Sequence, residues 1–195
     1  MKIIDISQEV LGCRVYGGDP TPKSEKVFDT ESGDLYNLST ISMCVHNGTH
    51  IDAPAHFISG GKTVSELGLD RFVGDCYVTR TDGFISAIEA QKIIRKAQSL
   101  GACEKILIAG DATVTAEAAK AFRDAGVRLL GNESQSVGPI DAPRAVHLIL
   151  LEAEIILLEG LNLFGVEEGR YFLNAAPLNI SGAEGAPCRA YLIKD

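Results

Sequence analysis

The chain has 195 residues and a formal net charge of −8, with 46% hydrophobic and 23% charged residues. This length is enough to build a hydrophobic core, and the composition is that of an ordinary soluble globular protein. The acidic balance and the lack of a basic block argue against nucleic acid and anionic membrane surfaces as partners.

The first eighty residues predict a β-rich region. Short β-branched runs at residues 2–6, 38–45 and 76–79 are separated by Gly, Asp and Pro, which favour turns. The hydrophobic period then changes. Residues 86–89 form a capping box, which predicts a helix that ends at Gly101.

The second half alternates between buried strands and helices. Strands are predicted at residues 105–109, 127–130, 155–158, 176–180 and 189–193. Helices are predicted from Thr115 to Gly126 and, as a short helical turn, near residues 142–151. Two strand–helix alternations of this kind predict a parallel layer with right-handed crossovers. Since no repeat or linker interrupts the order, we expect one mixed β/α domain over residues 1–195.

The five cysteines are scattered along the chain, odd in number and never arranged as CxxC. This pattern is typical of free thiols in a reducing compartment. The N-terminal segment has no long apolar stretch, so no signal peptide is predicted. The sequence therefore predicts a cytoplasmic protein.

Three of the four histidines lie in the segment HNGTHIDAPAH, residues 46–56. Its glycine, threonine and proline make it a poor helix, so we expect an extended chain whose even-numbered residues share one face. A straight strand would separate His46 from His50 by roughly 13 Å, so binding one ion requires a bend, which Gly48 is best able to supply. Two imidazoles and the Asp52 carboxylate are suited to Zn²⁺ or Mn²⁺. The alternative is a surface loop whose histidines bind nothing.

Four further residues are candidates for the chemistry. The fourth histidine is His147, and Glu159 follows an apolar strand at the edge where α/β proteins place their chemistry, although such a carboxylate is more often solvated. Cys44 could be a ligand, but a free cysteine more often packs as a small apolar residue. Ser134 could join a hydrolase triad, yet no nucleophile-elbow motif surrounds it.

The histidine segment resembles HxGTHxDxPxH, the signature of the metal-dependent cyclase family that includes bacterial kynurenine formamidases and isatin hydrolases. The resemblance covers nearly the whole chain. Residues 16–19 are similar to the aromatic-Pro-Gly-Asp loop of the family, and residues 127–136 to its strand and turn before the second metal histidine. Residues 177–182 and 187–190 are similar to its closing segment.

The resemblance implies an α/β fold of the swivelling β/β/α kind, assembled as a homodimer or a larger oligomer such as a tetramer. It implies two metal ions per subunit, Zn²⁺ or Mn²⁺. The implied ligands are His46, His50, Asp52, His147 and Glu159. Asp52 and Glu159 are implied to be shared between the ions, and His56 is the implied catalytic proton-transfer residue.

The predicted function is hydrolysis of a small aryl formamide such as N-formylkynurenine by a metal-bound hydroxide, with His56 delivering a proton to the departing nitrogen. Tyr16 is the predicted substrate-binding residue, although the sequence leaves a core position equally open. Because Tyr16 stands where formamidases have tryptophan, a cyclic amide, a lactone or another small acyl compound is an alternative substrate. A non-catalytic metal-binding or ligand-binding module is the alternative outside catalysis.

Overall fold

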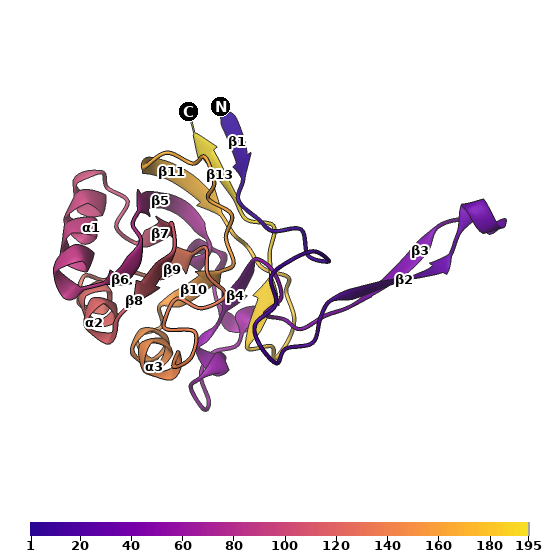
Figure 1. The fold of residues 1–195 in the computed structure, drawn as a ribbon, viewed down its shortest axis with the longest axis horizontal. Coiled ribbons are helices and arrows are strands. Elements are labelled where there is room, and N and C mark those ends of the chain that lie inside the picture. The colour runs from indigo at the N-terminus through magenta and orange to yellow at the C-terminus, as the bar shows by residue number, and fades with distance from the viewer. Residues whose placement is uncertain (195) are drawn as a thin grey trace.

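Residues 1–194, which the computed structural model describes, contain a nine-stranded mixed sheet (Figure 1). Its strands in spatial order are β1 (Lys2–Asp5), β13 (Tyr191–Lys194), β11 (Gly169–Asn174), β5 (Val73–Arg80), β7 (Lys105–Ala109), β9 (Leu129–Asn132), β10 (Ile156–Glu159), β4 (His50–Asp52) and β12 (Gly185–Pro187). The central strands β5, β7, β9 and β10 run parallel, and the outer strands pair antiparallel. The predicted mixed α/β class and its parallel layer are confirmed.

Helices cover one face of this sheet (Figure 1). They are α1 (Ala87–Ser99), α2 (Ala116–Asp124) and α3 (Arg144–Glu152). The Ser86 hydroxyl accepts the Glu89 N–H, and the Glu89 carboxylate accepts the Ser86 N–H, so the predicted capping box begins α1. No helix within residues 1–194 combines the length and the apolar character needed to cross a bilayer.

Two hydrophobic cores lie on the two faces of the sheet. On β7, Ile106 and Ile108 face the helices, whereas Leu107 packs into the second core on the opposite face. Because neighbouring residues of a strand point to opposite faces, this continuous apolar run serves both cores. Side chains from β4, β11 and β13 close the second core, so the histidine-bearing strand β4 is part of its wall.

Two smaller sheets complete the fold. Strands β6 (Gly83–Ile85) and β8 (Ala112–Val114) pair in parallel. Strands β2 (Lys23–Phe28) and β3 (Leu38–Ser42) form an antiparallel hairpin that projects from the body as a long arm (Figure 1). Every residue of β2 and β3 is exposed. Among residues 1–194, the two strands of the arm therefore contribute no buried side chain to either hydrophobic core.

Several predicted helices and strands begin or end at other residues in the structure, and one predicted strand does not form. The strand expected at 38–45 stops at Ser42, and the helical turn expected near 142–151 is the nine-residue helix α3. The strand expected at 176–180 does not form; Pro177 makes only an isolated bridge, because proline has no N–H for a ladder. The sequence analysis missed β2, β6, β8, β11 and β12. All five cysteines are free, as predicted.

Candidate metal centre

The histidine segment folds as a bend, a short strand and a 3₁₀ turn. Gly48 has a left-handed φ of +67° and forms the predicted bend. Only His50–Asp52 is a strand, and Pro54–His56 forms the turn. The prediction of one extended segment is therefore wrong, because His46 lies before β4 and His56 after it.

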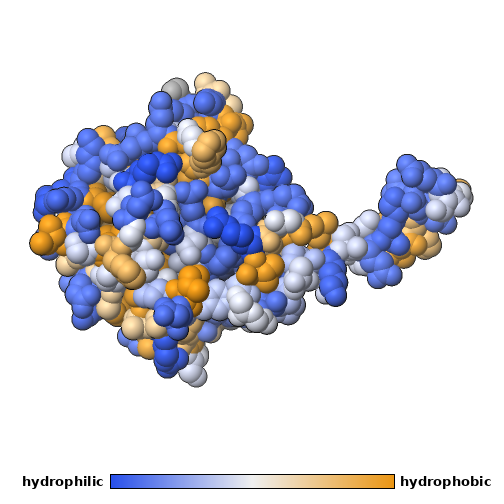
Figure 2. All heavy atoms as spheres, in the orientation of Figure 1, coloured by the Kyte–Doolittle hydropathy of each residue, from blue (hydrophilic) through white to orange (hydrophobic). Residues whose placement is uncertain are grey.

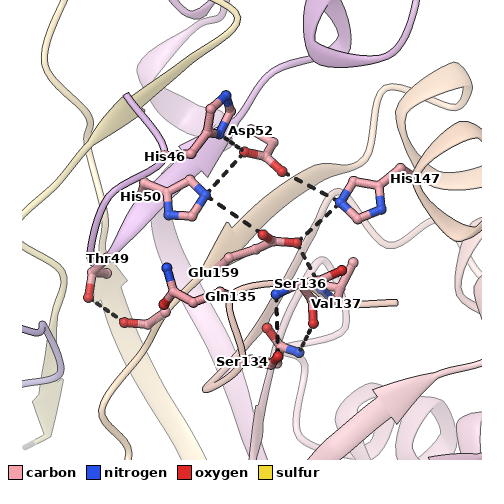
Figure 3. Close-up of polar contacts among 12 residues, drawn as sticks. His46, Thr49, His50, Asp52, Ser134, Gln135, Ser136, Val137, His147 and Glu159 are labelled. Carbon is pink, nitrogen blue, oxygen red and sulfur yellow. Dashed lines mark hydrogen bonds and ion pairs between the residues drawn. The ribbon is translucent and has the colours of Figure 1, made fainter. Parts of the chain in front are cut away.

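The end of β10 and one face of α3 bring the remaining side chains to this place. Glu159 is the last residue of β10 and pairs in register with His50 of β4, at the predicted C-terminal edge of the parallel strands. His147 is a buried residue of α3. Figure 3 shows side chains pointing toward one another from these elements. They are His46, His50, Asp52, His147 and Glu159.

Asp52 lies at the centre of this group. Its Oδ1 is 2.8 Å from His46 Nδ1 and 3.4 Å from His50 Nε2, and its Oδ2 is 3.8 Å from His147 Nε2. Glu159 spans the other side, with Oε2 3.7 Å from His50 Nε2 and Oε1 3.3 Å from His147 Nε2 (Figure 3). Each carboxylate therefore approaches at least two imidazoles through different oxygens.

Backbone groups orient the ligand atoms. His50 Nδ1 lies 3.0 Å from the Gly48 carbonyl oxygen, and His147 Nδ1 lies 2.9 Å from the Pro143 carbonyl oxygen. Since a carbonyl only accepts, each Nδ1 carries a proton, and each Nε2 faces the centre, where a metal ion would replace any proton on it. The Val137 N–H similarly donates to Glu159 Oε1 at 2.8 Å. These contacts fix the side chains as second-layer contacts do around bound metals.

The donor set fits a divalent metal ion. Asp52 Oδ2 is buried and has no hydrogen-bond partner among the described residues. Leaving buried polar atoms unpaired is costly, and a bound cation would remove that cost. Ligand atoms lie within 4.8 Å of one another in two sets of three. These sets are His46, Asp52 and His56, and His50, Asp52 and Glu159. Their nitrogen and oxygen donors suit Zn²⁺ or Mn²⁺.

Burial and close contacts shift the protonation of the metal-free centre. Burial opposes charge on His50, but the Asp52 and Glu159 carboxylates outweigh it and raise the pKa of His50 to about 9. Burial also opposes charge on Asp52, yet the neighbouring imidazoles hold the pKa of Asp52 well below its usual range. Burial, aided by the Asp52 charge, raises the pKa of Glu159. Protons and metal ions therefore compete for the same donor atoms.

A cavity of about 250 Å³ opens onto the centre. Tyr16, Phe57 and Pro143 supply its apolar wall, and Asp19 adds a carboxylate. The Tyr16 hydroxyl donates to the Ile140 carbonyl at 2.6 Å, so the ring is held against the cavity rather than in the core. Further lining residues that the sequence analysis did not single out are Gln135 and Ser136.

His56 lies in the cavity beside the centre. Its ring centroid is 4.2 Å from that of His46, 4.6 Å from that of Phe57 and 6.1 Å from that of His147. Burial lowers the pKa of His56, so the neutral imidazole prevails at neutral pH. A neutral imidazole can accept a proton and return it later, which suits a proton-transfer residue. The same position also places a ring nitrogen of His56 within 4.8 Å of candidate ligand atoms of His46 and Asp52, so His56 could instead bind a metal ion with them.

Residues 4–139 match the Cyclase family model. The chain belongs to the cyclase family. The kynurenine formamidase of Salinibacter ruber is 32% identical, with 98% of this chain and 97% of that relative covered. A solved structure described as a potential metal-dependent hydrolase with cyclase activity is 29% identical, with a TM-score of 0.80 and coverage of 98% and 96%. Isatin hydrolase A from Labrenzia aggregata has the same fold at 23% identity, with a TM-score of 0.82 and coverage of 100% and 94%.

These matches confirm the predicted family, the cyclase-like fold and the assignment as a hydrolytic enzyme of the amidohydrolase kind. In this cyclase-family enzyme, two weaker candidates lie outside the group of candidate ligands. Cys44 is half-buried, accepts the His46 N–H at 3.4 Å, and has a thiol whose pKa burial raises. Ser134 accepts the Ser136 N–H at 3.3 Å, and no hydrogen bond joins it to His147 within residues 1–194.

Gly185 is a residue of this site that the sequence reasoning missed. From the sequence, the pair Gly182 and Gly185 indicates only a turn. In the structure Gly182 has the left-handed φ of +74° that suits a turn, but Gly185 belongs to β12, which pairs with β4. A Cβ at Gly185 would lie 2.7 Å from His46 Cε1 and 2.8 Å from the Ile51 carbonyl oxygen. The bare backbone therefore lets β12 lie directly against His46.

Proposed function

We propose that this enzyme hydrolyses an aryl formamide of the N-formylkynurenine type with two divalent ions, Zn²⁺ or Mn²⁺, bound per chain. The observation that carries the proposal is the convergence of two carboxylates and three imidazoles at one end of the cavity. The choice of substrate is supported by the near full-length similarity to relatives named kynurenine formamidase.

The proposed ligand sets divide around Asp52. His46, His50 and Asp52 hold one ion, in keeping with the contacts of Asp52 Oδ1. His147 and Glu159 hold the second together with Asp52, in keeping with the contacts of Oδ2 and Oε1. With its ions bound, such a centre supplies an activated water and stabilises negative charge on the acyl oxygen.

Side chains of the cavity complete the proposed reaction. The ring of an aryl formamide packs against Tyr16 and Phe57, whose faces offer apolar contact area to an aromatic ring. His56 accepts a proton as water adds to the formyl carbon and then delivers it to the aniline nitrogen. That nitrogen is a poor leaving group without a proton, so the C–N bond breaks as the proton arrives.

A substrate panel tests the proposal. Enzyme treated with chelator, then reconstituted with Zn²⁺ or Mn²⁺, is assayed with N-formylkynurenine, isatin and a small lactone. We expect N-formylkynurenine hydrolysis only after metal is restored. Cleavage of isatin or the lactone with N-formylkynurenine untouched would replace the proposed substrate by a cyclic one. If the reconstituted protein hydrolyses none of the three compounds, the proposed activity is wrong and the alternative of a non-catalytic binding module is favoured.

We also propose that the chain assembles as a homodimer or tetramer through the arm formed by β2 and β3. A two-stranded hairpin is marginally stable alone, and this one exposes large apolar side chains. They are Val27, Phe28, Leu35, Tyr36, Leu38 and Ile41. Figure 2 shows apolar surface near the outer end of the arm and near its base. A second copy of the chain would cover these side chains.

Light scattering after size exclusion tests the assembly. We expect a mass of two or four times 20.8 kDa for the unmodified chain. The double variant Leu35→Ser with Ile41→Ser should dissociate into monomers at a higher protein concentration than the unmodified chain. The control Ile88→Ser, at an exposed position of α1, should dissociate at the same concentration as the unmodified chain. A monomeric mass for the unmodified chain would contradict the proposal.

A further inference from the structure

We infer that Asp19 is a specificity residue, whose carboxylate binds an ammonium group on the substrate. The inference rests on the proposed function, because it concerns which aryl formamides the same cavity accepts. It adds a charge requirement that the metal centre alone does not impose.

One tight turn fixes Asp19 beside the aromatic wall of the cavity. The Asp19 N–H donates to the Tyr16 carbonyl at 3.0 Å, and Gly18 has φ +101°. A positive φ at the third residue of a four-residue turn is the position that glycine fills in type II turns. Tyr16 and Asp19 both line the cavity. The carboxylate is therefore held at a set place relative to the ring that contacts substrate.

Within the described part of the chain, the Asp19 carboxylate lacks a cationic partner. It is half-buried, and within residues 1–194 no lysine, arginine or histidine nitrogen lies within 4.0 Å of it. Asp19 Oδ2 instead accepts a weak hydrogen bond from the Cys44 thiol, with Sγ 3.8 Å from Oδ2. A partly desolvated carboxylate is stabilised when a cation pairs with it and donates charge-assisted hydrogen bonds to it.

Away from the metal centre, the cavity has no strongly basic side chain that could bind an anionic part of a substrate. Among the described residues that line it, none is a lysine or an arginine. Glu159 is engaged by Val137 and the imidazoles, which leaves Asp19 as the carboxylate available to substrate. The charge pattern therefore favours a substrate with a positive group beyond its aromatic ring.

This chemistry separates two classes of aryl amide. With the formyl group at the metal centre and the ring against Tyr16, an ammonium on the ring's side chain would lie in the same cavity as Asp19. N-formylkynurenine carries such an ammonium, next to a carboxylate for which the described lining offers no lysine or arginine, whereas isatin and simple formanilides carry no ammonium. Asp19 thus favours formamides that carry an ammonium over those that do not.

The test compares N-formylkynurenine with its desamino analogue, 4-(2-formamidophenyl)-4-oxobutanoate, which lacks only the amine. For Asp19→Asn we expect KM for N-formylkynurenine to rise about 10-fold, with kcat within about twofold, which is the size of one charge-assisted hydrogen bond. KM for the desamino analogue, which keeps the carboxylate but lacks the ammonium, should not rise. Asp141→Asn, which removes an exposed carboxylate outside the cavity, should behave as the unmodified enzyme with both substrates.

The possible results distinguish a wrong role for Asp19 from a wrong proposed function. If the unmodified enzyme hydrolyses neither formamide, the proposed function is wrong. If it hydrolyses both, and Asp19→Asn weakens both equally or neither, the function stands and the inference is overturned. Added salt supplies a second readout, because screening should raise KM for N-formylkynurenine in the unmodified enzyme and not in the variant.

Discussion

Replacing His56 by alanine should abolish most turnover while leaving the metal centre filled. The residue lies in the turn after β4, outside the pairwise contacts that join Asp52 and Glu159 to the other imidazoles. Its ring lies tilted against that of His46, with centroids 4.2 Å apart and planes 36° apart. Because the side chain is half-buried at the cavity, water can occupy the space left by the substitution.

The size of the effect follows from the role. A positioned proton-transfer group contributes ~10²–10⁴-fold, so kcat for N-formylkynurenine should fall in that range, about 3–5 kcal/mol in barrier. Phenyl formate supplies the control, because phenolate leaves without a proton, and its kcat should fall less than about 10-fold. Metal content, measured by elemental analysis of the same preparation, should match that of the unmodified enzyme.

The assay also distinguishes the competing role of His56. It is one of three residues whose donor atoms lie within 4.8 Å of one another, with His46 and Asp52. If His56→Ala loses metal in proportion to activity, His56 is a ligand and the assignment of proton transfer is refuted. Equal losses with the formamide and the formate ester, at full metal content, would refute it as well.

Three further predictions follow from the same contacts. Asp52→Ala should lose most bound metal by elemental analysis, since Asp52 approaches three imidazoles; unchanged metal content would refute its bridging role. Gly185→Ala should destabilise the fold by about 1–3 kcal/mol in urea and weaken metal binding, because its Cβ would meet His46; a neutral result would show that β12 can shift. The metal-free protein should lose stability as pH rises from 6.5 through about 9, because the folded state holds a proton on His50 that the unfolded state releases earlier. A urea midpoint that is constant or rises over that window would contradict this sign.

The sequence predicted the elements whose causes are local. The capping residues Ser86 and Glu89 act within four positions of each other, and helix α1 begins where they predict. The ligand candidates of the histidine segment are likewise close in sequence, and the bend at Gly48 is a property of that residue alone. Placing His147 and Glu159 with them depended on a family resemblance, because their approach requires α3 and β10 to pack beside β4.

Features that depend on long-range pairing were not predictable in this way. Strand β12 pairs with β4 across more than 130 residues, so the close approach of Gly185 to His46 leaves no local pattern. Of the two strands of the arm, β3 was predicted from its β-branched run, but β2 was missed because all its residues are exposed and it lacks the alternation by which strands are recognised. The unpaired state of Asp19 likewise depends on which charges fold near it.

The central claim is that the carboxylates and imidazoles of this centre hold two ions for formamide hydrolysis. The most direct measurement is a titration of the metal-free enzyme with Zn²⁺ or Mn²⁺, in which bound metal and N-formylkynurenine hydrolysis are followed together. We predict that hydrolysis rises to its limit as bound metal reaches two equivalents per chain. Full activity without bound metal, or no hydrolysis at two equivalents, would contradict the account.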